Sequence, residues 1–285
     1  MGVHKTATTH IQESLWAQAD WLRARGRVAL SFNETQEVFQ TPLTWALDPP
    51  VNWRLLRREV ASALEGAAGG AECVIVSFER FLGPLRDLFS RDALYPEAAA
   101  RVHALAGLLS DHQVTVFLAL RDYARFAASA YCEALRWGPF FPFDAVRDDL
   151  LRDGLLDWRP LVTALLEAFG ADAVRLWRYE DYGTGREAIL RALTRLDEDM
   201  PTLSDGHPRA RFSREAVAAM AREAGALPPA THPRRIADLA RAYPTPQNPP
   251  FDPWTADEAA RLSARYAHHL AELPPGLFLP LRNRA

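Results

Sequence analysis

The chain of 285 residues contains almost no lysine. Of its 33 Lys and Arg residues, Lys5 is the only lysine and the other 32 are arginine. Lysine carries a compact ammonium on a flexible stem, whereas arginine carries a wide planar fork, so the two cations suit different sites. A site that must place one small ammonium beside one oxygen does not readily accept a guanidinium. Lys5 is therefore the first candidate functional residue, and its chance survival in an arginine-biased sequence is the alternative.

Cysteine, long apolar runs and an excess of positive charge are scarce as well. Cys73 and Cys132 form neither a disulfide framework nor a metal-ligand pattern, and the eight histidines have no metal-binding spacing. No apolar run approaches the roughly 20 residues of a transmembrane helix, and no secretory signal precedes the first expected element. A net charge of −3 gives no basic field for nucleic acid. We expect a cytoplasmic protein that binds neither metal nor nucleic acid.

The residues after Lys5 are small and rich in hydroxyl groups: Thr6, Ala7, Thr8 and Thr9. A helical pattern of apolar residues follows at Ile11, Leu15, Ala19 and Leu22. Thr9 and Gln12 fit a capping box, which predicts that the helix begins near Thr9. The free N–H groups and the dipole at such a helix start favour an anion. The glycines of a Walker A motif are missing, and a capped helix without a ligand is the alternative.

A second candidate anion contact follows an apolar, β-branched run. Residues 114–120 predict a buried parallel strand. Arg121 comes directly after it, and Ser129 follows eight residues later in a predicted helix. Arginine offers a bidentate fork to a phosphate, and two helical turns bring the serine hydroxyl back to the same edge. The pair is a weak signal alone and a stronger one in combination with the Lys5 segment.

These motifs together resemble those of the bacterial PAPS-dependent sulfotransferases. The run His-Lys-Thr-Ala-Thr-Thr-x-x-Gln, residues 4–12, resembles the loop that binds the 5′-phosphosulfate in that family. Arg121 and Ser129 match the family's pair of residues on the 3′-phosphate. The segment 169–181, with Phe-Gly followed by Tyr-Glu-Asp, resembles a third family segment whose tyrosine lies near the adenine. That tyrosine corresponds to Tyr179, for which packing in the core is the alternative.

The resemblance covers about residues 3–225 and implies a set of binding residues. Lys5, Thr6, Ala7, Thr8 and Thr9 would contact the phosphosulfate, and Arg121, Ser129 and Tyr179 the rest of the nucleotide. Arg211, with Arg209, is the candidate for the family's late basic loop. There are three departures from the family: Ala7 stands where glycine is common, the strand before the loop is almost absent, and the late basic loop has no clear equivalent beyond the position of these two arginines. Alanine is strained at Ala7 if its φ is positive.

The pattern of elements predicts an α/β protein. Expected helices span residues 53–64, 98–109, 160–169, 186–196, 213–223 and 255–273, strands span 73–78, 114–120 and 174–179, and segments 137–143 and 228–254 are irregular. With the resemblance, this implies one domain, residues 1–285, with a three-layer P-loop-like fold. The mainly parallel sheet would carry helices on both faces, and residues 228–285 would pack on it as a proline-rich segment and a final helix. Lys5, Glu79, Arg121 and Tyr179 all follow expected strands, which predicts one shared edge.

The implied reaction moves a sulfuryl group from 3′-phosphoadenosine 5′-phosphosulfate (PAPS) to a hydroxyl or amine. Lys5 would stabilise the charge that forms on the bridging oxygen of the leaving phosphate. Glu79 is the candidate general base for the acceptor, with His4 and His10 as alternatives. For Glu79, capping of the next turn is an equal alternative.

The acceptor class and two other functions stay open. A small molecule, a carbohydrate or a lipid would suit the apolar surface expected at residues 137–143. A P-loop kinase is one alternative, although the Walker glycines are missing. A catalytically degenerate sulfotransferase-like domain that binds a nucleotide or a partner is the other. The sequence leaves the oligomeric state undetermined.

Overall fold

The computed structural model describes residues 5–84, 89, 94–198, 200–201, 211–245 and 247–281. Within these residues the chain is an α/β protein with four short strands in two parallel pairs. His4 and Arg209 lie outside the described residues, and so does the strand expected before the Lys5 loop. We use "Lys5 loop" for residues 5–7, which lead into the first helix.

The first half of the chain forms one strand pair and the helices around it. Its elements are α1 (Thr8–Ala17), α2 (Ala19–Arg23), β1 (Arg27–Ala29), α3 (Phe32–Ala46), α4 (Trp53–Ala68), β2 (Cys73–Ile75), the 3₁₀ turn η1 (Glu79–Leu82) and α5 (Ala98–Leu108). Apolar residues of α3, α4 and α5 pack together beside β1 in a shared core that includes Phe39, Val60 and Leu105.

The second half contributes the other strand pair and most of the larger helices. Its elements are β3 (Val116–Leu120), α6 (Tyr123–Trp137), α7 (Asp144–Leu151), α8 (Arg159–Phe169), η3 (Ala171–Ala173), β4 (Val174–Arg178), η4 (Tyr179–Asp181), α9 (Tyr182–Thr194), α10 (Arg214–Glu223), η5 (Ala224–Ala226), η6 (Pro229–Thr231), α11 (His232–Ala242), α12 (Ala256–Ala271) and η7 (Pro275–Leu277). Its core joins β3 and β4 to α6, α8 and α12.

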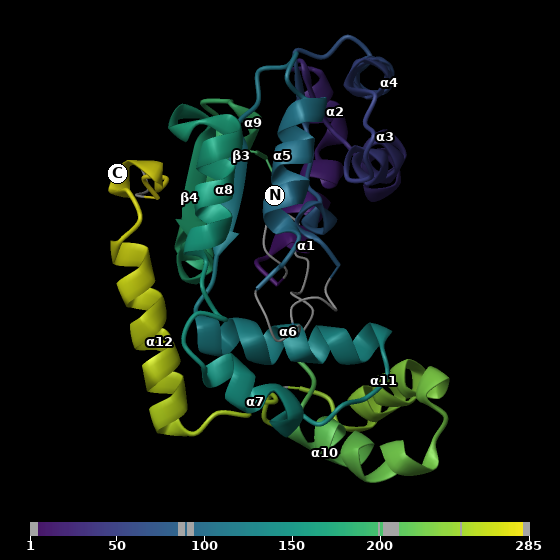
Figure 1. The fold of residues 1–285 in the computed structure, drawn as a ribbon, viewed down its shortest axis with the longest axis vertical. Helices are drawn as coiled ribbons and strands as arrows, with labels where there is room; N and C mark the ends of the chain where they lie inside the picture. Colours follow the sequence, from purple (N-terminus) through teal and green to yellow (C-terminus); the bar gives the residue numbers. More distant parts are fainter. Residues whose placement is uncertain are drawn as a thin grey trace.

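Both strand pairs are parallel and have a fixed register. β1 pairs with β2 from Arg27 opposite Cys73 to Ala29 opposite Ile75. β3 pairs with β4 from Val116 opposite Val174 to Leu120 opposite Arg178. All five residues of β3 are buried, as expected for a central parallel strand. The carboxyl ends of β3 and β4 point towards α6, which crosses the molecule between these strands and helices α7, α10 and α11 (Figure 1).

Helix α1 packs against residues of both strand pairs. Ile11 and Leu15 of α1 share one core cluster with Ile75 of β2, Phe117 of β3 and Trp177 of β4. Since α1 begins directly after the Lys5 loop, this cluster fixes the loop near the strand ends. The exposed Ala19 is the one residue of the predicted apolar face that points to solvent.

The predicted capping box at Thr9 is wrong. Helix α1 begins one residue earlier, after Ala7, and no side chain caps its first turn. The Gln12 side chain instead donates a hydrogen bond of 2.7 Å to the carbonyl oxygen of Ser77, beyond the end of β2. The Gln12 side chain, which the local pattern assigned to the cap, therefore makes a tertiary contact that connects α1 to the segment after β2.

Most of the other predicted helices and strands agree with the structure, and a few do not. The helices predicted at 53–64, 98–109, 213–223 and 255–273 are confirmed as α4, α5, α10 and α12, and the loop after Trp137 is confirmed. The strand predicted at 73–78 ends at Ile75, and the proline-rich segment 228–254 contains α11 with Pro233 in its first turn, a position that tolerates proline. β1, α3 and α7 were missed.

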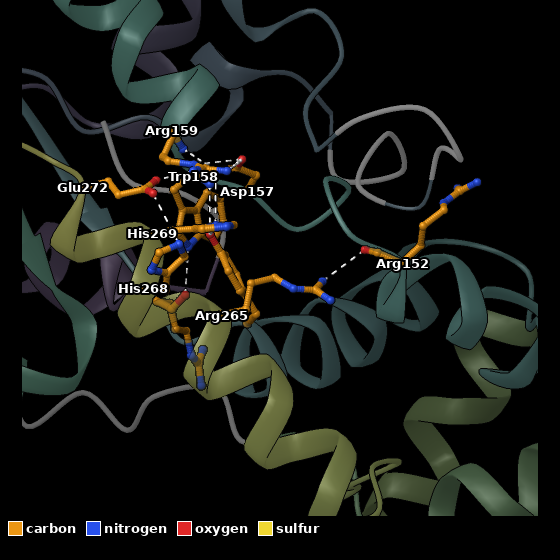
Figure 2. A network of polar contacts seen from close by, with 10 residues as sticks. Arg152, Asp157, Trp158, Arg159, Arg265, His268, His269 and Glu272 are labelled. Atoms are coloured by element: carbon orange, nitrogen blue, oxygen red, sulfur yellow. Dashed lines mark hydrogen bonds and ion pairs between the residues drawn. The ribbon is translucent and has the colours of Figure 1, made fainter.

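A network of polar contacts attaches α12 to α8 and α6 (Figure 2). Arg159 donates to both Asp157 and Glu272. His269 Nδ1 lies 2.8 Å from the Tyr123 hydroxyl and 3.4 Å from Asp157 Oδ1. We call these residues the α12 network. In the described part of the chain, no helix has the length and apolarity needed to cross a bilayer.

Candidate functional site

Arg121 connects three segments that lie far apart in the sequence. It follows β3 directly, and its Nη1 donates a hydrogen bond of 2.5 Å to the carbonyl oxygen of Lys5. Its guanidinium carbon lies 4.3 Å from the ring centroid of Tyr179, the first residue after β4. Three of the residues predicted at one edge of the sheet therefore meet in the structure.

The ends of β3 and β4 are held together next to Arg121. Asp122 caps α6 by accepting a hydrogen bond of 3.0 Å from the Arg125 N–H. The backbone N–H of Asp122 donates to Glu180 Oε1 at 2.9 Å, and Trp158 Nε1 donates to the Arg121 carbonyl at 2.9 Å. These bonds fix the main chain on both sides of Arg121, so its side chain is presented from a rigid position.

Arg121 is half-buried, and charges of both signs act on it. Burial lowers the pKa of Arg121 most and the charge of Arg211 lowers it further, while Tyr179 and Glu180 act in the opposite direction. Arg211 itself donates to the carbonyl of Phe251 at 3.2 Å. Arg121 Nε is buried and has no hydrogen-bond partner among the described residues. A bound anion would compensate both the charge and this donor.

Lys5 makes an ion pair that the sequence did not reveal. Its Nζ lies 3.1 Å from Oε2 of Glu133, and the two side chains are only 15% and 11% exposed. Glu133 Oε1 accepts a hydrogen bond of 2.9 Å from Trp137 Nε1, and Arg136 Nε lies 3.3 Å from Oε2. Ser129 and Glu133 are one turn apart on α6, which is the only sequence signal that could have suggested Glu133.

The Lys5 loop has an unusual backbone. Lys5 has a φ of 67° and Ala7 a φ of 62°, both in the left-handed region. A residue with a Cβ pays roughly 1–2 kcal/mol there relative to glycine. The strain that the missing glycine predicted at Ala7 is therefore present. Strained backbone of this kind clusters at functional sites, where the surrounding structure maintains it.

The three threonines of the segment face different surroundings. Thr6 and Thr8 are 1% and 5% exposed and line a small cavity beneath the loop, together with Ile75 and Trp177. Thr8 Oγ1 has no hydrogen-bond partner among the described residues. In this segment only Thr9 is exposed, while Lys5 and Ala7 are half-buried.

The remaining predicted residues divide between the site and other positions. Ser129 is buried on α6, next to the position of Glu133 in the helix. Glu79 is half-buried and begins η1. His10 Nδ1 lies 2.6 Å from the Tyr182 hydroxyl, so this ring nitrogen already has a partner. In the described residues, no cluster of three or more His, Cys, Asp or Glu could hold a metal ion.

The geometry defines a site with two cations, one carboxylate and one aromatic ring, from the Lys5 loop, β3, α6 and β4. Comparison of the chain with protein-family models, with curated proteins and with solved structures found no match. The site therefore rests on its own chemistry: it combines a compact ammonium, a guanidinium with a spare donor and an aromatic face. This combination suits an anionic ligand that also carries a flat ring.

Proposed function

We propose that the protein is a PAPS-dependent sulfotransferase that sulfates a small-molecule, carbohydrate or lipid acceptor, without a metal. One observation carries the proposal: Arg121 contacts both the Lys5 carbonyl and the Tyr179 ring. The resemblance to the sulfotransferase family assigned these three residues to the same nucleotide from three separate motifs. Their meeting at the strand ends supports that assignment, because ligands of parallel sheets bind at the carboxyl ends of the strands.

The proposed roles follow from the chemistry of each residue. Lys5 stabilises the charge that develops on the bridging oxygen, assisted by the donors at the start of α1. Arg121 and Ser129 hold the 3′-phosphate, with Arg211 as a further positive charge nearby. The ring of Tyr179 lies against the adenine. Each role uses a residue type that offers the required charge or surface.

The proposed fold is the three-layer P-loop-like arrangement, in one domain. It requires that the pairs β1–β2 and β3–β4 belong to one parallel sheet. The cluster shared by Ile75, Phe117 and Trp177 supports this, because it brings residues of β2, β3 and β4 together under α1. Helices on both faces would then cover the sheet.

Nucleotide binding provides the test. We expect adenosine 3′,5′-bisphosphate to raise the melting temperature of the protein and to bind in calorimetry, whereas ATP with Mg²⁺ does not. Arg121→Ala should weaken the binding about 10- to 100-fold, the effect of losing a charged hydrogen-bonding partner worth about 1.5–3 kcal/mol. Arg159→Ala is the control: it removes an arginine that is bonded to Asp157 and Glu272 in the α12 network and should leave the affinity unchanged.

The alternatives predict different results. Stabilisation by ATP with Mg²⁺ alone would favour a P-loop kinase. No response to either nucleotide would contradict the proposal and favour a domain that binds a partner. Binding of adenosine 3′,5′-bisphosphate without transfer of ³⁵S-labelled sulfate to any acceptor in a panel of sugars, phenols and lipids would indicate a degenerate, nucleotide-binding domain.

A further inference from the structure

Glu133 is the carboxylate that the structure places against the catalytic lysine of the proposed reaction. Its Oε2 lies 3.1 Å from Lys5 Nζ, and the carboxyl group is 11% exposed at the side-chain level. The other oxygen accepts the Trp137 Nε1 hydrogen bond at 2.9 Å. Trp137 itself is 72% exposed and ends α6. The carboxylate thus lies between the lysine and a solvent-facing aromatic side chain.

The charges around Glu133 make its protonation depend on Lys5. Burial would raise the pKa of the carboxyl, but the Lys5 charge, the Trp137 hydrogen bond and the Arg136 charge together hold it below its ordinary value. Arg136, whose Nε lies 3.3 Å from Oε2, acts on the carboxyl together with Lys5. When an anionic donor engages the Lys5 ammonium, the carboxylate loses its strongest counter-charge and becomes more basic.

We propose that Glu133, and not Glu79, is the general base of the sulfuryl transfer. This inference rests on the proposed function. The phosphosulfate group would take the Lys5 ammonium away from Glu133 and leave the carboxylate beside the reacting sulfur. An acceptor lying against Trp137 would present its hydroxyl to the carboxylate oxygen that Lys5 had contacted. One exchange of partners would then prepare both the leaving group and the nucleophile.

The step balances with these two residues. The carboxylate of Glu133 removes the proton of the acceptor hydroxyl, and the acceptor oxygen forms a bond to sulfur. The bond from sulfur to the bridging oxygen breaks, and its electron pair stays on the phosphate of adenosine 3′,5′-bisphosphate. The Lys5 ammonium stabilises that charge. The products are a sulfate ester, the bisphosphate and a protonated Glu133.

Two measurements on Glu133→Gln, with Glu79→Gln as the matched control, test the inference. First, transfer of ³⁵S-labelled sulfate by Glu133→Gln should fall about 10²–10⁴-fold in kcat, the range of general-base catalysis, and lose its dependence on pH on the acid side. Affinity for adenosine 3′,5′-bisphosphate should stay equal or rise, because the neutral amide competes less for Lys5. Glu79→Gln should keep kcat within about tenfold of that of the unmodified protein, which is less than the loss expected on removal of a general base.

The second measurement needs no acceptor. Calorimetry of adenosine 3′,5′-bisphosphate binding near pH 5.5, in two buffers of different ionisation enthalpy, gives the protons taken up on binding. Subtracting the Glu133→Gln result removes the protons of the ligand itself. We expect the unmodified protein and Glu79→Gln to take up additional protons that Glu133→Gln does not. A urea titration of each variant checks that it is folded.

The possible outcomes separate the two proposals. Equal kcat in Glu133→Gln and the unmodified protein would overturn the role of Glu133 and leave the proposed function intact. If no acceptor is sulfated, equal proton uptake by Glu133→Gln and the unmodified protein would also overturn the role of Glu133 and leave the proposed function intact. A loss of kcat in Glu79→Gln alone would restore Glu79 as the base. Absence of any nucleotide binding by the unmodified protein would overturn both proposals together.

Discussion

The candidate site and the α12 network use arginine in opposite ways. Arg159 of the network donates to two carboxylates, Asp157 and Glu272, and these bonds raise its pKa. Arg121 of the site donates to a backbone carbonyl, keeps a buried Nε without a partner among the described residues, and has a lowered pKa. A saturated arginine stabilises the fold, whereas an under-compensated arginine is prepared for an anion.

The same contrast holds for the backbone at the start of two helices. Helix α12 begins with a complete capping box, in which Thr255 and Glu258 bond to each other's backbone N–H groups. Helix α1 begins after Ala7 in a left-handed conformation, without a side-chain cap. The N–H groups of α1 are thus left for other partners, while those of α12 already have them. The left-handed start at Ala7 is thus what distinguishes α1 from the capped start of α12.

The largest expected effect is the loss of activity when Lys5 of the candidate site is replaced. If the proposed function is correct, Lys5→Ala should reduce sulfate transfer about 10²–10³-fold or more, because the proposal assigns to Lys5 the charge that stabilises the leaving oxygen. Lys5→Arg should also lose most of the transfer, although it keeps the charge, because a planar fork does not fit a point-charge site. The measurement is transfer from a ³⁵S-labelled donor, with urea unfolding as the check on folding.

The double variant Lys5→Ala with Glu133→Gln serves as a control for this test. It removes the buried charge of the Glu133 carboxylate, which the single variant leaves without its Lys5 partner, so its stability should return towards that of the unmodified protein. Transfer by Lys5→Ala at the rate of the unmodified protein would show that the lone lysine has no catalytic role, and the contrast with the α12 network would lose its functional meaning.

A smaller effect is expected from relief of backbone strain in the Lys5 loop. Ala7→Gly should stabilise the protein by about 1 kcal/mol, because glycine adopts a positive φ without the clash of a Cβ. Ala63→Gly, at an exposed position within α4, is the matched control and should destabilise by about 0.5–1 kcal/mol. Free energies of unfolding from urea titrations decide the signs. Destabilisation by both changes would disprove a strained loop.

The smallest effect concerns pH and belongs to the α12 network. Burial lowers the pKa of His269, while the charge of Asp157 opposes this. Below the ordinary histidine pKa of about 6.5, the unfolded chain therefore binds a proton that the folded protein binds only at lower pH. The free energy of unfolding should fall as the pH is lowered from 7 to 5.5, by a fraction of the limit of about 1.4 kcal/mol per pH unit for one proton.

Two adjacent histidines provide the comparison for this prediction. His269→Gln should flatten the pH dependence of stability, whereas His268→Gln should leave it, because the His268 side chain is 70% exposed and that of His269 is 9% exposed. Urea titrations at pH 7, 6.25 and 5.5 give the slopes. A slope unchanged by His269→Gln would show that the buried histidine does not couple the network to pH.

The sequence was sufficient to predict residues that follow strands. The run of buried residues in β3 predicts a parallel strand, and Arg121 lies at its end for that reason alone. Tyr179 follows β4 in the same way, and the two side chains meet because the strands are paired in parallel. Periodicity also located α4, α5 and α12. These features depend on patterns within single segments and on one general rule of sheet geometry.

Features that depend on contacts between distant segments were not predictable. Glu133 lies on a helix face, and only the position of the Lys5 loop, 128 residues away in the sequence, pairs it with Lys5. Gln12 has the right spacing for a cap, but its side chain contacts Ser77. β1 has three residues, too few for an alternating pattern. Helix α11 was not predicted because its segment is rich in proline, but its own proline lies in the first turn, where a helix tolerates it.

The rarity of lysine in this chain also makes the candidate site chemically addressable. Lys5 carries the only side-chain primary amine of the sequence. A reagent that acylates amines therefore finds among the side chains a single target, and that target lies in the ion pair with Glu133. Attaching the protein to a sensor surface through lysine would block the site itself. For the same reason, the extent of acylation measured by mass spectrometry would report directly how far a ligand occupies the site.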